Sequence, residues 1–110
     1  FERYELWALT NKTTLLPRYL LLSTYKQIRE NHFDKLEILD SFEEALQTAH
    51  KFHNVYDMCW INLECARWLI SINQKRHRIS RMVKQGLKIL RSLELNNHLR
   101  LAEIEFDEYI

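Results

Sequence analysis

The segment Asn54–Ile72, NVYDMCWINLECARWLISI, constrains the fold more than any other part of this chain. At helical spacing its apolar residues form two stripes, and only a narrow strip of polar residues lies between them. The stripes are Met58, Ile61, Cys65, Trp68 and Ile72, and Cys59, Leu63, Ala66 and Ile70; the polar strip is Glu64, Arg67 and Ser71. A helix that is apolar around most of its circumference must be covered on several sides. The segment therefore predicts the central helix of an all-helical array.

The scarcity of glycine and proline also favours helices. The 110 residues include one glycine and one proline, too few for sandwiches or barrels, whose corners need residues with positive φ. Hydrophobic residues make up 46% and charged residues 28%, which is typical of a globular chain and not of a disordered one. The formal net charge of +1 argues against a protein that binds a polyelectrolyte through its overall charge.

The two cysteines, Cys59 and Cys65, lie on the same expected helix. At about 100° per residue they fall on different faces, so they cannot pair with each other while that helix is intact. Unpaired thiols predict an intracellular, reducing compartment, the cytoplasm or the nucleus. We find neither a signal peptide nor an uncharged run of about 18 residues, and expect no membrane contact. Because the chain begins with Phe1 and not with Met, we expect it to be a piece of a longer polypeptide.

A shift of 41 residues aligns apolar residues of the chain with apolar residues further along it. The aligned pairs include Trp60 with Leu101, Ile61 with Ala102, Leu63 with Ile104, Cys65 with Phe106, Leu69 with Ile110, Ala45 with Gly86 and Leu46 with Leu87. Chance helical periodicity rarely stays in phase over about 35 positions. We therefore predict one helical-repeat domain, 1–110, with repeat units of approximately 19–59 and 60–100 and partial units at both ends.

Six helical segments and no strand are expected. They are 1–10, about 14–31, 35–53, 54–72, 79–93, and a last segment from the break at Asn96-Asn97 to the chain end. Asp34 with Glu37 resembles a capping box, Asn54 occupies an N-cap position, and Pro17 is tolerated in a first turn. The residues expected to be buried in segment 35–53 are Leu36, Leu39, Phe42, Leu46, Ala49 and Phe52.

The ends of a repeat array need a cover, because a repeat unit cannot bury its own hydrophobic face. We expect Trp7 at one end, and Phe106 or Ile110 at the other, to meet further chain or a partner.

The segment Ser41–Leu46, SFEEAL, followed by Ala49, resembles the second helix of a tetratricopeptide-type repeat. Its Ala45, and Gly86 in the next copy, are small residues that let two helices approach closely. The usual unit of that family has 34 residues, so this chain is similar to a long variant. The resemblance implies an all-α fold of antiparallel helical pairs, stacked as a right-handed superhelix. It also implies a concave groove that binds peptides or helices of other proteins.

Two surfaces are candidates for binding a partner. The groove would be lined by exposed residues on the first helix of each pair, such as Lys26, Glu64 and Arg67. A basic stripe on the helix 79–93 would instead bind nucleic acid or an acidic segment; it consists of Arg81, Lys84, Lys88 and Arg91. In a nearly neutral chain such a stripe is more often an ordinary solvated face. We therefore favour a protein–protein interaction scaffold, and a purely structural spacer is also compatible with the repeat.

No catalytic, cofactor or metal site is expected, and the chain is predicted not to be an enzyme. His50 and His53 stand one helical turn apart, but a zinc site needs further convergent ligands. The acidic residues of the last segment, Glu103, Glu105, Asp107 and Glu108, form the polar side of that helix, with nothing to place them in a pocket. Trp60 and Trp68 follow the apolar pattern and are interpreted as core residues.

Overall fold

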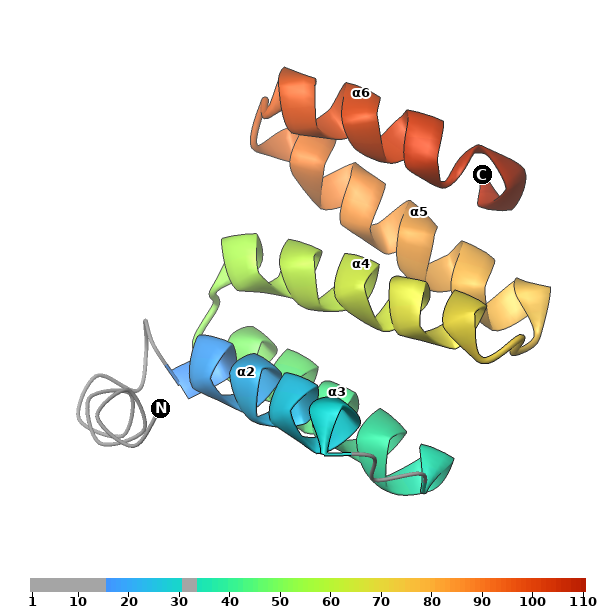
Figure 1. Cartoon of the computed structure of the whole chain (residues 1–110). Helices are drawn as coiled ribbons and strands as arrows, with labels where there is room; N and C mark the ends of the chain where they lie inside the picture. The colour runs from blue at the N-terminus through green and yellow to red at the C-terminus, as the bar shows by residue number, and fades with distance from the viewer. Residues whose placement is uncertain (1–15, 31–33) are drawn as a thin grey trace. The chain divides into compact units, whose positions relative to one another are not determined.

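The computed structural model describes residues 16–30 and 34–110, and this part of the chain is all-α (Figure 1). The helices are α2 (Leu16–Arg29), α3 (Lys35–Lys51), α4 (Val55–Ser71), α5 (Arg76–Ser92) and α6 (Asn96–Glu105), followed by a 3₁₀ turn, η1 (Asp107–Tyr109). The all-α fold of paired helices is thereby confirmed. The expected helix 1–10, with Trp7, lies outside the described residues.

The chain divides into two compact units, residues 1–57 and 58–110. In the first unit α2 packs on α3, and the Ser41 hydroxyl donates a hydrogen bond to Gln27 Oε1 at 2.9 Å. In the second unit α5 contacts α4 at Gly86, and it also packs against α6 and η1. Within each unit successive helices run in opposite directions (Figure 1). The single domain and its repeat units at about 19–59 and 60–100 stay predictions.

Helix starts recur at the 41-residue spacing that the sequence predicts. Lys35 and Arg76 begin α3 and α5, and Val55 and Asn96 begin α4 and α6; both intervals are 41 residues. The expected start of the fifth helix at residue 79 is wrong by three residues. The turn after α4 is complete at Gln74, so Lys75 takes the N-cap position and the helix begins at once.

The turns after α3, α4 and α5 have one common construction, the Schellman motif. After α4, the Gln74 amide donates to the Leu69 carbonyl at 3.0 Å and the Asn73 amide to the Ile70 carbonyl at 3.1 Å. Equivalent pairs of bonds close α3 and α5. The residue with left-handed backbone in each turn is His53, Asn73 or Glu94, with φ of 54°, 54° and 57°. These turns are made without glycine, which explains how so glycine-poor a chain can change direction repeatedly.

Two predicted helix caps are confirmed. Asp34 Oδ1 accepts a hydrogen bond from the Leu36 amide at 3.0 Å, and Asn54 Oδ1 accepts one from the Asp57 amide at 3.3 Å. The buried Asp57 carboxylate is held in turn by Arg18 Nε at 3.1 Å and Asn54 Nδ2 at 2.9 Å. This ion pair fixes the start of α4 to α2 within the first unit.

The buried side of α3 agrees with the prediction in part: Phe42 and Ala49 are fully buried as expected, while Ile38 and Ala45 are fully buried without being among the six expected residues. The fully buried residues are Ile38, Phe42, Ala45 and Ala49, while Leu39, Leu46 and Phe52 are half-buried. The expectation that Leu36 is buried is wrong, since its side chain is 72% exposed. Leu36 lies about 200° around the helix from Ile38 and therefore faces away from the core.

The last helix does not run to the chain end as expected but stops at Glu105. The η1 turn is tied to α5: the Arg76 guanidinium donates to the Glu108 carbonyl and the Ser80 hydroxyl to the Tyr109 carbonyl at 2.7 Å. Phe106 is fully buried, so this residue is covered by the chain itself, whereas Ile110 is 56% exposed.

Gly86 lets α4 and α5 approach closely, as the sequence predicts. A Cβ atom at Gly86 would lie 2.7 Å from Cδ2 and 2.8 Å from Cγ of Leu63. Leu63 is 1% exposed and has little room to move. The Cys59 thiol donates to the Gly86 carbonyl at 3.5 Å across the same contact. Leu63 thus occupies the space that a side chain at position 86 would take.

Gly86→Ala is expected to lower the free energy of unfolding by about 1 kcal/mol. Overpacking costs about 1–3 kcal/mol, and the better helix propensity of alanine offsets about 1 kcal/mol of this. In a Leu63→Ala background the clash is removed, so the same substitution should stabilise the chain. Urea denaturation of the four proteins measures both effects, and equal losses in the two backgrounds would contradict the close contact.

Glu94→Gly is expected to raise the free energy of unfolding by about 1 kcal/mol. A side chain in left-handed backbone costs about 1–2 kcal/mol, and the greater freedom of glycine in the unfolded chain reduces the gain. The matched control is Glu103→Gly, at an exposed helical position of α6, which should lose about 1 kcal/mol. Thermal denaturation that shifts both variants in the same direction would argue against the left-handed turn.

Candidate partner-binding site

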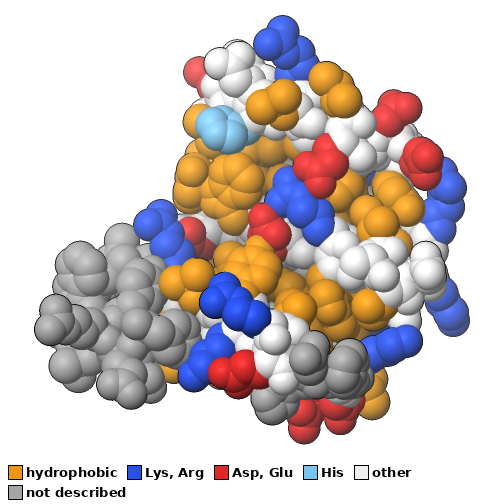
Figure 2. All heavy atoms as spheres, in the orientation of Figure 1, with side chains coloured by type: hydrophobic (Ala, Val, Ile, Leu, Met, Phe, Trp, Pro, Cys, Tyr) orange, Lys and Arg blue, Asp and Glu red, His pale blue; other side chains and the backbone are white. Residues whose placement is uncertain are grey.

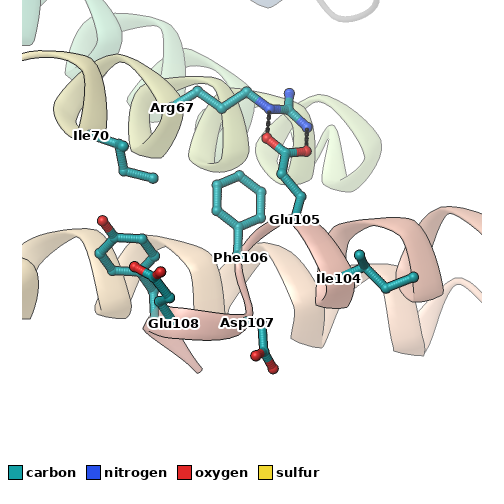
Figure 3. A pocket seen from close by; sticks show the side chains of 8 residues that line it. Arg67, Ile70, Ile104, Glu105, Phe106, Asp107 and Glu108 are labelled. Carbon is teal, nitrogen blue, oxygen red and sulfur yellow. Dashed lines mark hydrogen bonds and ion pairs between the residues drawn. The ribbon is translucent and has the colours of Figure 1, made fainter.

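The candidate site is a hollow between the C-terminal half of α4 and the segment 104–109, inside the second unit (Figure 3). We call it the α4–α6 hollow; its volume is about 610 Å³. The lining residues are Arg67, Ile70, Ile104, Glu105, Phe106, Asp107, Glu108 and Tyr109. They come together because α6 follows α4 by one repeat and both helices pack against α5.

One arginine of α4 holds the end of α6 in place. Arg67 Nε and Nη2 donate to Glu105 Oε2 at 2.6 Å and to Glu105 Oε1 at 2.8 Å, and Arg67 Nη1 donates to Glu64. The guanidinium carbon lies 5.4 Å from the centroid of the Phe106 ring. Figure 3 shows Glu105 and Phe106 both pointing toward α4. A planar guanidinium matches both oxygens of a carboxylate at once, which makes this arrangement geometrically specific.

The ion pair changes the titration of both partners. The hydrogen bond from Arg67 holds the pKa of Glu105 below its ordinary value of 4.5. The hydrogen bond to Glu105 raises the pKa of Arg67, against the opposing effect of burial. The Glu105 side chain is 43% exposed, so solvent screens the pair and its contribution to stability is modest.

The hollow combines an apolar floor with an acidic rim. Phe106 is fully buried at its base, and Ile70 and Tyr109 are half-buried beside it. Asp107 and Glu108 are exposed at the rim, while the charge of Arg67 is already matched by Glu105 and Glu64. Such a surface can bury an apolar side chain of a ligand and attract cationic groups next to it.

The three residues predicted for the groove lie in different surroundings. Arg67 lines the hollow, and Glu64 is its partner on α4; their side chains are 35% and 26% exposed, less than expected for free groove residues. Lys26 belongs to the first unit, where Lys26 Nζ lies 3.9 Å from Glu30 Oε1. A partner-binding role for these three residues stays a prediction.

Sequence reasoning missed the residues that α6 and η1 contribute. The sequence pattern places Glu105, Asp107 and Glu108 only on the polar side of a regular helix, which conceals the turn after Glu105. One available signal was the alignment of Phe106 with Cys65 at the 41-residue shift. Both residues are buried. The match therefore indicates which side of the last helical segment faces inward, and that side contributes Phe106 to the hollow.

The basic stripe lies along the exposed face of α5. Arg81, Lys84, Lys88 and Arg91 are all exposed, and the opposite face buries Ile79, Met82, Val83, Gly86, Leu87 and Leu90. Near the start of α5 a second hollow is lined by Arg76, His77, Ser80, Arg81 and Lys84. The stripe is therefore a solvated face on which cations gather, and its binding role stays a prediction.

The remaining candidates do not converge on a site. Trp60 and Trp68 are half-buried at the edge of the core, and the Trp60 ring meets the His98 ring edge-on with centroids 5.7 Å apart. Cys59 and Cys65 are buried thiols that form no disulfide, and burial raises the pKa of the Cys59 thiol to about 11, which keeps it protonated. His50 and His53 are exposed.

Within 16–30 and 34–110, no group of three or more His, Cys, Asp or Glu side chains is placed to hold a metal ion. In the same ranges no helix combines the length and the apolar character needed to cross a membrane.

Paired helices at a 41-residue spacing, with a small residue at the contact between them, define a helical-repeat protein of the tetratricopeptide type. A family model described as CHK1-like, TPR repeats, matches residues 1–110, and the chain belongs to this family. The chain is also 96% identical, over all of its 110 residues, to a segment of histidine protein kinase 1 of Candida albicans. It spans 4% of that relative's length. No solved structure matches the chain.

Glu105→Gln is expected to destabilise the chain by about 1 kcal/mol at about pH 7 and by much less at about pH 3. The pKa of Glu105 is lower in the folded chain than in the unfolded chain. The contribution of the carboxylate is therefore complete above the unfolded value and disappears as the pH falls through the folded value.

Urea denaturation across this pH range measures the effect, with Glu103→Gln on the same helix as the matched control. A loss for Glu105→Gln that does not depend on pH would contradict the ion pair with Arg67.

Proposed function

We propose that this chain is a protein-interaction module and that the α4–α6 hollow binds a segment of a partner protein. Membership of a TPR repeat family supports the general role. The observation that carries the specific proposal is the hollow itself, which lies between the first helices of two successive pairs and has an apolar floor. Cys59 and Cys65 are buried and form no disulfide, which supports a reducing intracellular location.

The charges of the hollow define the chemistry of the partner. Glu105, Asp107 and Glu108 contribute carboxylates, and Arg67 is the cation that lines it. A partner segment with an apolar anchor next to lysine or arginine would complement this surface. A partner carboxylate would have to displace Glu105 from Arg67, which costs the bidentate pair.

The much longer relative indicates where such a module would act. The relative that matches this chain is a histidine kinase, of which the matched segment is a small part. We propose that the module brings a partner protein to a polypeptide whose kinase activity resides elsewhere in the chain.

Selection of displayed peptides on the 110-residue chain tests the hollow. We expect the enriched peptides to combine apolar and basic residues. Asp107→Lys with Glu108→Lys should weaken their binding by about tenfold or more, because it reverses the charge of the rim. The matched control is Arg81→Glu with Lys84→Glu, which changes the net charge by the same amount in the opposite direction and should leave the affinity intact. Circular dichroism checks that both variants remain folded.

The basic stripe supports a second candidate function, the binding of nucleic acid or an acidic segment. The cluster of Arg76, His77, Arg81 and Lys84 around the second hollow favours it. Such binding falls steeply with salt concentration, since it releases counterions. If acidic ligands bind the chain and the rim variant, but not the variant with Arg81→Glu and Lys84→Glu, the basic stripe and not the hollow is the binding site.

A further inference from the structure

The second hollow, near the start of α5, has the opposite charge to the α4–α6 hollow. Its volume is about 620 Å³, and its lining residues are Arg76, His77, Ser80, Arg81 and Lys84. No aspartate or glutamate is among these five residues. The last four are spaced as i, i+3, i+4 and i+7, so they lie on one face of α5. Figure 2 shows Lys and Arg side chains at the right of the view, where α5 begins in Figure 1. The second hollow is therefore a concave, basic surface.

The cations of the second hollow differ from Arg67 in their partners. Arg67 is paired with two carboxylates of the chain. In the part of the chain that the structure describes, no carboxylate forms an ion pair with Arg81 or Lys84. Arg76 donates a hydrogen bond to the Glu108 carbonyl, which is a neutral group. The positive charges around the second hollow therefore attract a negatively charged ligand.

The η1 turn holds two of the lining side chains in place. The Ser80 hydroxyl donates to the Tyr109 carbonyl at 2.7 Å. Arg76 is bound to the Glu108 carbonyl, and its guanidinium carbon lies 5.3 Å from the centroid of the Tyr109 ring. A guanidinium has five N–H donors, so Arg76 keeps donors for a ligand after binding this carbonyl. Because the side chain is already ordered, little rotamer freedom is lost when a ligand binds.

A phosphate monoester matches this surface better than a carboxylate does. It carries a charge of about −1.5 to −2 at neutral pH and three acceptor oxygens, whereas a carboxylate has a single charge and two oxygens. We propose that the second hollow binds a phosphorylated serine or threonine side chain of a partner protein. Arg81 and Lys84 donate to the phosphate oxygens from the exposed face of α5, and Arg76 donates from the side that η1 holds.

The shape of the site favours one phosphate over the row of phosphates in a nucleic acid. The basic stripe continues along α5 to Lys88 and Arg91, which do not line the second hollow. A nucleic acid would use the whole stripe, whereas one phosphorylated residue uses the second hollow alone. The family's role in protein interactions makes a protein the carrier of the phosphate.

The site is also separate from the groove that the family resemblance implies. That groove lies on the first helix of each pair, and α5 is a second helix. The inference rests on the second candidate function, the binding of anions by α5, and narrows it to one hollow and one chemical group. It does not depend on the α4–α6 hollow, which attracts cations.

Binding of degenerate peptides to the 110-residue chain tests the inference. Fluorescence polarisation compares three libraries of equal length, whose fixed central residue is phosphorylated serine or threonine, the unphosphorylated residue, or glutamate. The phosphorylated library should bind at least about tenfold more tightly than the other two, because it brings more charge and more acceptor oxygens. Equal affinity of the phosphorylated and glutamate libraries would overturn the inference, and so would the absence of binding.

Two charge reversals on the same face of α5 locate the site. Arg81→Glu with Lys84→Glu should weaken binding of the phosphorylated library by at least about tenfold, because it removes two cations of the second hollow. Lys88→Glu with Arg91→Glu changes the net charge by the same amount and should weaken binding by less than about threefold at physiological salt. All four side chains are exposed, and circular dichroism checks that both variants are folded. Equal losses in the two variants would assign binding to the whole stripe and contradict the inference.

Two further measurements separate this inference from the other functions. A single-stranded oligonucleotide that binds more tightly than the phosphorylated library, and that depends on Lys88 and Arg91, would make nucleic acid the ligand and overturn the inference. The rim variant, Asp107→Lys with Glu108→Lys, should still bind the phosphorylated library, because it leaves the cations of the second hollow in place. Loss of binding in the rim variant would place the phosphate outside the second hollow and also overturn the inference.

Discussion

The second unit depends on the contact between Leu63 and Gly86. Because Gly86 has no side chain, α5 lies close enough to α4 for Leu63 to be buried against its backbone. With α5 held there, α6 and η1 pack against it, and Arg76 and Ser80 of α5 bind the carbonyls of the final turn. Only with α4 and α6 both held by α5 can Arg67 reach Glu105. The candidate site is therefore a consequence of one close helix–helix approach.

The turns between the helices also share one construction. Three successive Schellman motifs reverse the chain after α3, α4 and α5, and each places a residue other than glycine in left-handed backbone. Left-handed backbone at His53 and Glu94 costs free energy. This cost is offset because the turn supplies hydrogen bonds to the last carbonyl groups of each helix. Turns of constant construction keep the helix starts at regular intervals, and this regularity makes α6 comparable with α4 position by position.

Much of the fold could be predicted because its causes are local or periodic. The caps at Asp34 and Asn54 depend on neighbouring backbone amides, and the buried side of α3 follows from helical spacing. The failures have equally physical reasons. Leu36 is apolar but points away from the core, which a pattern that counts apolar residues cannot detect. Glu105 belongs to the site because Arg67, 38 residues away in sequence, binds it, and no local pattern records that pairing.

The sequence by itself determined that this protein is an array of paired helices with a 41-residue period and a small residue at the helix contact. Those properties reside in the spacing of apolar side chains and in backbone freedom, and neighbouring residues decide both. Only the tertiary structure decided that α6 ends at Glu105, that Phe106 is buried and that Arg67 forms an ion pair with Glu105. It also decided which apolar residues remain uncovered. These outcomes depend on which surfaces meet in space, and that is set by packing between helices and not by the pattern within any one of them.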